Sequence, residues 1–419
     1  MIVKSFVLKQ RSAGAIAALV DRDTIAVVRP QRKMEALLRE AIGTALIQKK
    51  PSDEILSRVE DYFLEMNASP VYQERVRSTV AALEAYLREA MYVQTSATAV
   101  EDYVLAKGAR LCAEAVNAAV GGTLLDGTEL MLCNSDANGE DQHFDWTASR
   151  EQILSRCTGT PLVISGGYGR LHSGYIVRVG KDGAHLMATL IAEVLKARSI
   201  EFHIEAHGVN GISAMTYDEA AHYCASEATA PFSSSAIWPA KNAGIPILVK
   251  DIEDEAFPGT VISTESAHGT AVLSEQDLSL ITVYGTGLLG RVGMSGGIFS
   301  ALAKAGVNVR FIAQTSSEYS ISFAVNQAQE TLAQQAIHGL FRDNPLLPLD
   351  DVVVLDRSVG IVTVFGSRMR NLPGTSGEVF AKLGAAGINI IASAQGGEEL
   401  SISIVVDAAD LPKAAELLT

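Results

Sequence analysis

The sequence predicts an α/β protein in which one large domain is followed by two copies of a smaller module. Three observations predict this fold class. Short apolar runs alternate with helical patterns over roughly residues 1–260. From residue 279 the chain repeats itself. Finally, a chain of 419 residues with 48% hydrophobic residues has enough apolar material for two or three buried cores.

Strands and helices are expected to alternate within the large domain. Strands are predicted at 2–8, 24–29, 129–133, 161–165, 174–179, 200–205 and 245–249. Helices are predicted near 31–49, 53–66, 71–92, 98–119, 183–198, 217–228 and 233–243. Pro30, Ser52 and Pro70 stand where three of these helices should begin.

The second part of the chain contains two copies of one module, related by a constant offset without gaps. Residues 280–285 return as 361–366, and residues 305–309 return as 386–390. Each copy shows the order strand, helix, strand, strand, helix, which is ferredoxin-like. The first copy gains a fourth strand at 351–355, whereas the second ends at Thr419 without one. We therefore expect Thr270–Leu273 to complete the second module, which gives bounds of 276–356 for the first and 268–275 plus 357–419 for the second.

Composition and charge exclude several classes of function. The formal charge of −14 opposes binding to nucleic acid or to an anionic membrane surface. Four scattered cysteines indicate a reducing compartment. The N-terminus does not resemble a secretory signal, and no apolar run is long enough to span a membrane. We therefore expect a cytoplasmic protein. No histidine spacing predicts a metal site, and the acidic stretch 136–145 is interpreted as a solvated loop.

Several segments resemble the aspartokinase family, and most closely its threonine-sensitive branch with tandem ACT domains. They are the stretch 306–323, the Thr-Tyr-Asp-Glu-Ala of 216–220, and the stretches 242–251 and 256–262. The resemblance implies an amino-acid-kinase-like three-layer domain over about 1–260, followed by two ACT domains. It also implies a place in the pathway that makes the aspartate family of amino acids.

The chain departs from the family where aspartokinases bind ATP and aspartate. The family opens with Lys-Phe-Gly-Gly-Thr-Ser, whose glycines let backbone amides approach phosphate, but residues 3–9 here contain no glycine. The family's Gly-Glu-Arg appears as Gly108, Ala109 and Arg110. Its Gly-Arg-Gly-Gly-Ser-Asp appears as residues 180–185, so that Ala184 and His185 replace the Ser and Asp.

Three further kinase motifs are also degenerate. The family's Thr-Asp-Val-Asp-Gly and Asp-Pro-Arg motifs reduce to residues 205–211, and its basic Lys-x-Leu-His-Pro-Arg segment reduces to residues 228–233. Loss of one transition-state donor typically raises a barrier by about 3–4 kcal/mol. We therefore interpret the kinase lobe as catalytically impaired, with no certain cofactor, and with ATP and Mg only if the lobe is active. Residual nucleotide binding would use Lys4, Gly166, Gly167 and Lys181, although a structural turn is the other interpretation of the glycines.

The repeated modules carry the candidate ligand residues. Gln314 and Gln395 end equivalent strands, and an amide offers both donors and an acceptor to an amino acid. With them, the resemblance assigns effector binding to Gly287, Asn308, Ser316, Ser317 and Asn389. Each asparagine has an alternative interpretation as a turn residue, and each glutamine as an exposed edge residue. Gly285, Gly287 and Gly290 fit a dinucleotide fingerprint, but the second copy lacks these glycines, so we assign them to an effector loop.

Two functional hypotheses follow from the sequence. The first is a regulatory aspartokinase homologue that binds a threonine-like amino acid, more strongly near Gln314 than near Gln395. It would form a homo-oligomer through its ACT domains, with an intact aspartokinase or a homoserine dehydrogenase as a possible partner. The apolar strands 320–325 and 401–406 are expected to form that interface. The second hypothesis is an active kinase that phosphorylates the carboxylate of aspartate or of a related amino acid.

Overall fold

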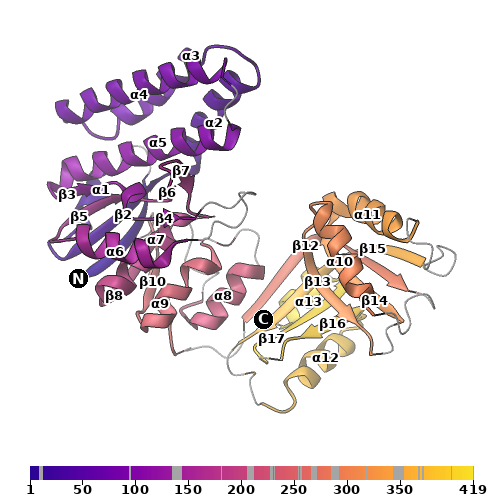
Figure 1. Cartoon of the computed structure of the whole chain (residues 1–419). Coiled ribbons are helices and arrows are strands. Elements are labelled where there is room, and N and C mark those ends of the chain that lie inside the picture. Colours follow the sequence, from indigo (N-terminus) through magenta and orange to yellow (C-terminus); the bar gives the residue numbers. More distant parts are fainter. Residues whose placement is uncertain are drawn as a thin grey trace. The chain divides into compact units, whose positions relative to one another are not determined.

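The chain forms two compact units, shown in Figure 1. In this computed structural model, the first unit comprises Met1–Ala225 with Thr229–Ala267, and the second comprises Ser226–Ala228 with His268–Thr419. The structure describes residues 1–8, 13–93, 96–134, 144–180, 182–204, 212–226, 230, 232–252, 254, 257–265, 271–284, 292–316, 319–342, 353–366, 369, 372–397 and 399–418. Among these residues, no helix combines the length and the apolar character that a membrane crossing requires.

The first unit is built on an eight-stranded, mostly parallel sheet. Its strand order is β3 (Thr123–Leu125), β5 (Leu162–Ser165), β2 (Thr24–Pro30), β1 (Ile2–Leu8), β8 (Ser199–Ile204), β10 (Ile247–Asp251), β11 (Thr260–Ser263) and β9 (Ala214–Thr216). Strands β10 and β11 pair antiparallel. The central strands are apolar almost throughout because helices cover both of their faces. A smaller sheet holds β4 (Leu132–Cys133), β6 (Tyr168–Leu171) and β7 (Ile176–Arg178).

Helices on the two faces of the large sheet complete three layers. The helices of this unit are α1 (Ala13–Ala18), α2 (Arg32–Leu46), α3 (Asp53–Leu64), α4 (Pro70–Ala90), α5 (Ala97–Val120), α6 (Trp146–Arg156), α7 (Gly183–Leu195), α8 (Tyr217–Ser226) and α9 (Trp238–Ala243). Helices α1 to α5 share one core with Phe6, Ala26 and Val28. Helix α7 lies on the opposite face, where Ala184 and Val27 approach the same glycine, Gly166. The predicted three-layer α/β fold is thus confirmed.

Most predicted elements of this unit are present, with several differences. The four helices predicted over 31–119 correspond to α2, α3, α4 and α5. The strand predicted at 129–133 is instead the end of a 3-10 turn, Gly127–Glu129, followed by the short β4. The sequence patterns missed α1, α6, β3, β6, β9 and β11. Ser52 precedes α3 as predicted but does not cap it, because its hydroxyl donates to the Ala41 carbonyl at 2.7 Å.

The second unit contains a continuous six-stranded sheet that both modules share. Its order is β13 (Val309–Gln314), β14 (Ser320–Asn326), β12 (Ala271–Tyr284), β15 (Val353–Phe365), β17 (Ser401–Asp407) and β16 (Ala392–Gln395). Helices α10 (Met294–Lys304) and α11 (Glu330–Arg342) belong to the first module. Helices α12 (Thr375–Ala385) and α13 (Leu411–Leu418) belong to the second.

The strand predicted to complete the second module has the expected partner. Ala271, Val272 and Leu273 pair antiparallel with Phe365, Val364 and Thr363 in the second half of β15. The other half of β12, from Leu278 onward, pairs with the first half of β15 and with β14. Each module therefore has the ferredoxin-like strand order, and the first module is inserted within the second. Thr270 lies outside the described residues, and the module bounds given above remain a prediction.

The face of the six-stranded sheet that carries no helices is covered within the chain itself. Leu278, Leu280, Phe311, Ile361 and Val405 form one buried cluster on this face, drawn from both modules. The two edge strands β13 and β16 also lie close together. Most apolar side chains of strands 320–325 and 401–406 point instead toward the helices. The predicted interface assumed an uncovered apolar face, and that assumption is wrong; the oligomeric state remains a prediction from the resemblance.

Lys4 belongs to a polar cluster on the large sheet and does not lie in a phosphate-binding turn. Its ammonium group donates to the Leu19 carbonyl at 2.9 Å and lies 3.5 Å from the Glu201 carboxylate. His203 donates to the same carboxylate at 2.9 Å, and Lys250 lies 3.8 Å from it. Burial alone would raise the pKa of Glu201, but the hydrogen bond from His203 and the two lysine charges lower that pKa from 4.5 to about 2.

Replacement of Glu201 should therefore destabilise the first unit in a pH-dependent way. A carboxyl group whose pKa is lowered on folding stabilises above its unfolded pKa and loses that effect as the pH falls. We expect Glu201→Gln to reduce the free energy of unfolding by about 1–3 kcal/mol at pH 7, with the difference shrinking between pH 4.5 and pH 2.

Denaturant unfolding followed by tryptophan fluorescence measures this effect, because both tryptophans of the chain, Trp146 and Trp238, lie in the first unit. Glu54→Gln, at an exposed position of α3, is the matched control and should change little. A difference between parent and Glu201→Gln that stays constant from pH 7 to pH 3 would contradict the assignment.

Candidate functional site

The carboxyl ends of β2 and β5 meet the N-terminus of α7, which is where ligands bind in open parallel sheets. Two glycines form the turn after β5. A Cβ on Gly166 would lie 2.7 Å from Val27 and from Ala184, and Gly167 has a φ of 96°. Val179 donates its backbone N–H to the Gly167 carbonyl at 2.9 Å. These contacts support the interpretation of Gly166 and Gly167 as a structural turn.

The N-terminus of α7 is occupied by an ion pair within the chain. Asp182 takes the N-cap position with a φ of 56°, in the place of a glycine in the family motif. Its carboxylate lies 3.6 Å from the guanidinium of Arg29 at the end of β2, and the two side chains are only 7% and 14% exposed. A carboxylate here already interacts with the positive end of the helix dipole. It therefore opposes the approach of a phosphate group.

His185, two residues after the start of α7, is fully buried and neutral. Burial, and then the charge of Arg29, hold the pKa of its imidazole well below the usual value. Neither ring nitrogen has a hydrogen-bond partner among the described residues. The ring lies 4.4 Å from that of Phe202 and contacts Phe232 edge-on. His185 thus packs as part of an aromatic cluster, whereas the family has an acidic side chain at this position.

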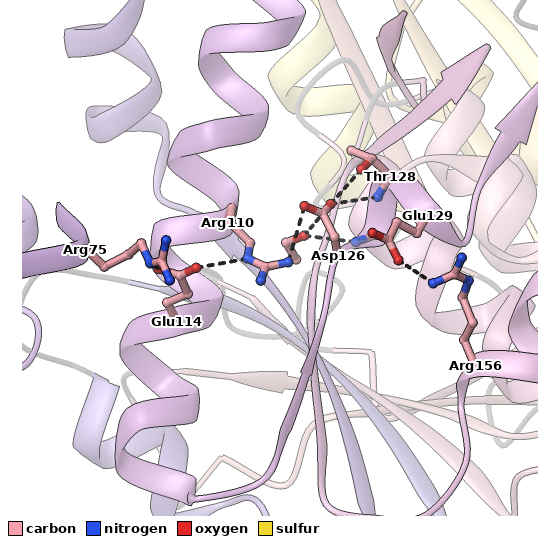
Figure 2. A network of polar contacts seen from close by, with 9 residues as sticks. Arg75, Arg110, Glu114, Asp126, Thr128, Glu129 and Arg156 are labelled. Carbon is pink, nitrogen blue, oxygen red and sulfur yellow. Dashed lines mark hydrogen bonds and ion pairs between the residues drawn. The ribbon is translucent and has the colours of Figure 1, made fainter. Parts of the chain in front are cut away.

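Arg110, the arginine retained from the family's Gly-Glu-Arg segment, is neutralised by two carboxylates of the chain. Figure 2 shows its guanidinium between Glu114, at 3.0 Å, and Asp126, at 3.3 Å. Asp126 also accepts hydrogen bonds from the backbone and hydroxyl of Thr128. The same figure shows Glu129, in the turn after β3, paired with Arg156 of α6. Arg110 therefore links α5 to the turn after β3.

The predicted nucleotide-binding residues do not form one site. Lys4 is on the same face of β1 as Phe6, which packs with α1 to α5, whereas Gly166 packs on the α7 face. Lys4 and the glycine turn therefore lie on opposite faces of the sheet, and nucleotide binding by these residues remains a prediction. Lys181 lies outside the described residues, as do residues 205–211 and most of 228–231.

In the second unit, the two candidate glutamines occupy equivalent places. Gln314 ends β13 and Gln395 ends β16. Ser295 in the first turn of α10 donates its hydroxyl to Gln314 Oε1 at 3.3 Å, and Ser376 in the first turn of α12 donates to Gln395 Oε1 at 3.2 Å. The sequence analysis missed both serines, although they are related by the same offset as the rest of the two modules.

The other predicted effector residues are only partly brought together. Ser316 is exposed just beyond Gln314, while Gly287 and Ser317 lie outside the described residues. Asn308 and Asn389 precede their strands, so each lies at the far end from its glutamine, about 20 Å away at ~3.3 Å per residue. The Asn308 backbone N–H donates to Gln329, which also binds the Gly306 carbonyl. The structure therefore separates both asparagines from the glutamine sites and supports their interpretation as turn residues.

A cavity of about 370 Å³ adjoins Gln395 in the second module. Its lining comprises Met369, Leu372, Pro373, Gly374, Thr375, Ser376, Gly377, Gln395 and Glu399. Gly374 is the N-cap of α12 with a φ of 99°, so the first N–H groups of an eleven-residue helix face this region. Arg368, Arg370 and Glu398, on which the prediction of a weaker second site depends, lie outside the described residues.

Comparison with known proteins identifies relatives for both units. A family profile described as an ACT domain matches residues 281–341 and 362–419. The maize bifunctional aspartokinase/homoserine dehydrogenase 1 is 28% identical over 82% of this chain and 40% of its own length. The Schizosaccharomyces pombe aspartokinase is 24% identical over 90% of this chain and 79% of its own. The chain thus spans less than half the length of the bifunctional relatives that it matches.

Solved structures share the fold over the whole chain. Escherichia coli aspartokinase III, in complex with lysine and aspartate, has a TM-score of 0.79 at 18% identity, covering 100% of this chain and 98% of that one. Clostridium acetobutylicum aspartate kinase has a TM-score of 0.77 at 17% identity, with the same coverage. The ACT-domain match and the curated relatives together show that this chain is a homologue of aspartokinases, and the solved structures show that it shares their fold.

Proposed function

We propose that this aspartokinase homologue is a regulatory protein that binds a small amino acid through its ACT modules and has an impaired kinase centre. The observation that carries the proposal is the cavity beside Gln395, at the N-terminus of α12. It would act within the aspartate-family pathway by association with other subunits, such as an intact aspartokinase or a homoserine dehydrogenase.

The lining of the cavity supports an amino-acid ligand. The N-terminus of α12 can receive a carboxylate, because its first backbone N–H groups have no partner within the helix. The Glu399 carboxylate, which also lines the cavity, suits an ammonium group. Gln395 offers polar contacts to a side-chain hydroxyl, while Met369, Leu372 and Pro373 suit the aliphatic part. A threonine-like amino acid combines all of these groups.

The charges at the kinase centre support the proposal that this centre is catalytically impaired. Phosphoryl transfer depends on cations and donors positioned around the transferred group. Arg29 is paired with Asp182, and Arg110 with Glu114 and Asp126. Among the described residues, the edge that would face the phosphates of ATP presents the Asp182 carboxylate, and Arg29 at this edge is already paired with it. The alternative of an active aspartate kinase is less well supported for this reason.

Substitution of the two glutamines tests the effector sites. We expect Gln395→Ala to weaken binding of L-threonine in the second module about tenfold, because the ligand hydroxyl loses a hydrogen-bond partner. Gln314→Ala should likewise weaken binding of L-threonine in the first module. The loss of affinity should be larger in this module, because the sequence predicts stronger binding near Gln314 than near Gln395. Isothermal calorimetry on the parent and on both variants measures this. Absence of heat with L-threonine and with other small amino acids in the parent would refute the effector proposal.

Aspartokinase activity should be very low. With ATP, Mg and L-aspartate, trapping of aspartyl phosphate as its hydroxamate should show turnover far below the ~1 per second at the low end of typical enzymes. An active aspartokinase assayed in parallel is the positive control, and L-threonine binding by the same preparation shows that the chain is folded. Turnover near 1 per second would instead favour the active kinase.

A further inference from the structure

The serine–glutamine contact occurs twice, once in each module and at equivalent positions. Ser295 and Ser376 each occupy the second position of a helix, and Gln314 and Gln395 each end an outer strand of the sheet. In both modules the serine hydroxyl donates to the amide oxygen, at 3.3 Å and 3.2 Å. Ser376 and Gln395 also both line the cavity of the second module.

In both modules the amide oxygen is the end that meets the serine, which leaves the NH₂ end of the amide available to a ligand. A glutamine side chain has one acceptor oxygen and one NH₂ group with two donors, and a half-turn of the amide exchanges their places. When a serine hydroxyl occupies the oxygen, the NH₂ group remains at the other end of the amide. That group donates hydrogen bonds and cannot accept them. A ligand atom that meets it must therefore be an acceptor, such as a hydroxyl or carboxylate oxygen.

We propose that Ser376, and Ser295 in the first module, are positioning residues that make each glutamine a donor toward the ligand. The sites would then select a small amino acid with an oxygen acceptor on its side chain and reject one with an ammonium group at that place. This proposal rests on the proposed effector function and specifies its ligand class. The serine acts through the glutamine, so its removal should change selectivity more than overall affinity.

The Ser376→Ala variant separates this role from a purely structural one. Without the hydroxyl, the Gln395 amide can rotate and present its oxygen, which accepts a hydrogen bond from an ammonium group. L-2,3-Diaminopropionate carries an ammonium group where L-threonine carries its hydroxyl. We therefore expect the preference for L-threonine over this analogue to fall from about tenfold or more to about threefold or less. Ser376→Thr retains a hydroxyl and should keep the preference of the parent.

Calorimetry in a Gln314→Ala background isolates the second module. In this background, each ligand is titrated into the protein with Ser376 intact, with Ser376→Ala and with Ser376→Thr. Ser78→Ala removes a hydroxyl on α4 that donates to the Arg75 carbonyl of its own helix at 3.0 Å, and it serves as the matched control. If Ser376→Ala fails to fold, Ser295→Ala in a Gln395→Ala background applies the same test to the first module.

The outcomes distinguish this proposal from the proposed function. A narrowed preference in Ser376→Ala, restored by Ser376→Thr, supports the positioning role. Equal weakening of both ligands, or an unchanged preference, overturns it while leaving amino-acid binding intact. Absence of heat with either ligand in the parent refutes the effector function, and the selectivity proposal with it.

Discussion

The antiparallel pairing of β12 with β15 is the constraint on which the fold of the second unit depends. Each of these long strands runs through both modules, so each module receives one of its strands from a segment that also serves the other. The register shifts between Glu275 and Leu278, where Asp277 adopts a φ of 58°. Arg310 of β13 holds this bulge through Glu275 at 2.6 Å. Neither module can therefore lose its strands without disrupting the sheet of the other.

The shared sheet also bears on the position of the proposed ligand sites. Its helix-free side forms a common core, and the serine–glutamine contacts of the proposed sites involve the helices of the other side. There, each module places the start of a helix beside the end of an outer strand, so that backbone N–H groups and a glutamine amide converge. The N–H groups and the glutamine belong to a helix and a strand, and such regular elements position functional groups more accurately than loops do. The duplication thus reproduces the geometry of a site together with the fold.

The features that could be predicted from the sequence are those that repeat or that have a strong period. The constant offset indicated the two modules, and the strand missing from the second copy indicated a strand before the first, of which the structure describes 271–273. The same offset relates Ser295 to Ser376. Neither serine was predicted as a site residue, because a serine in a helix gives no indication of its role until its partner is known. The face of the sheet on which Lys4 lies could not be predicted, because an apolar strand buried on both faces has no alternation that shows which face a side chain occupies. Similarly, no motif indicated that Arg29 would meet Asp182, which lies far away in the sequence.

The ion pairs of the first unit support the proposed impairment of its kinase centre. Arg29 lies 3.6 Å from the Asp182 carboxylate, and Arg110 pairs with Glu114 and Asp126, all in partly buried surroundings. To neutralise a phosphate, either arginine would have to leave its carboxylate, and an unpaired carboxylate at a buried position is strongly unfavourable. The same contacts join β2 to α7, and α5 to the turn after β3, so they stabilise the edge of the sheet that a nucleotide would otherwise hold together. Stability at this edge therefore opposes the binding of a nucleotide there, which supports the proposed impairment of the kinase centre.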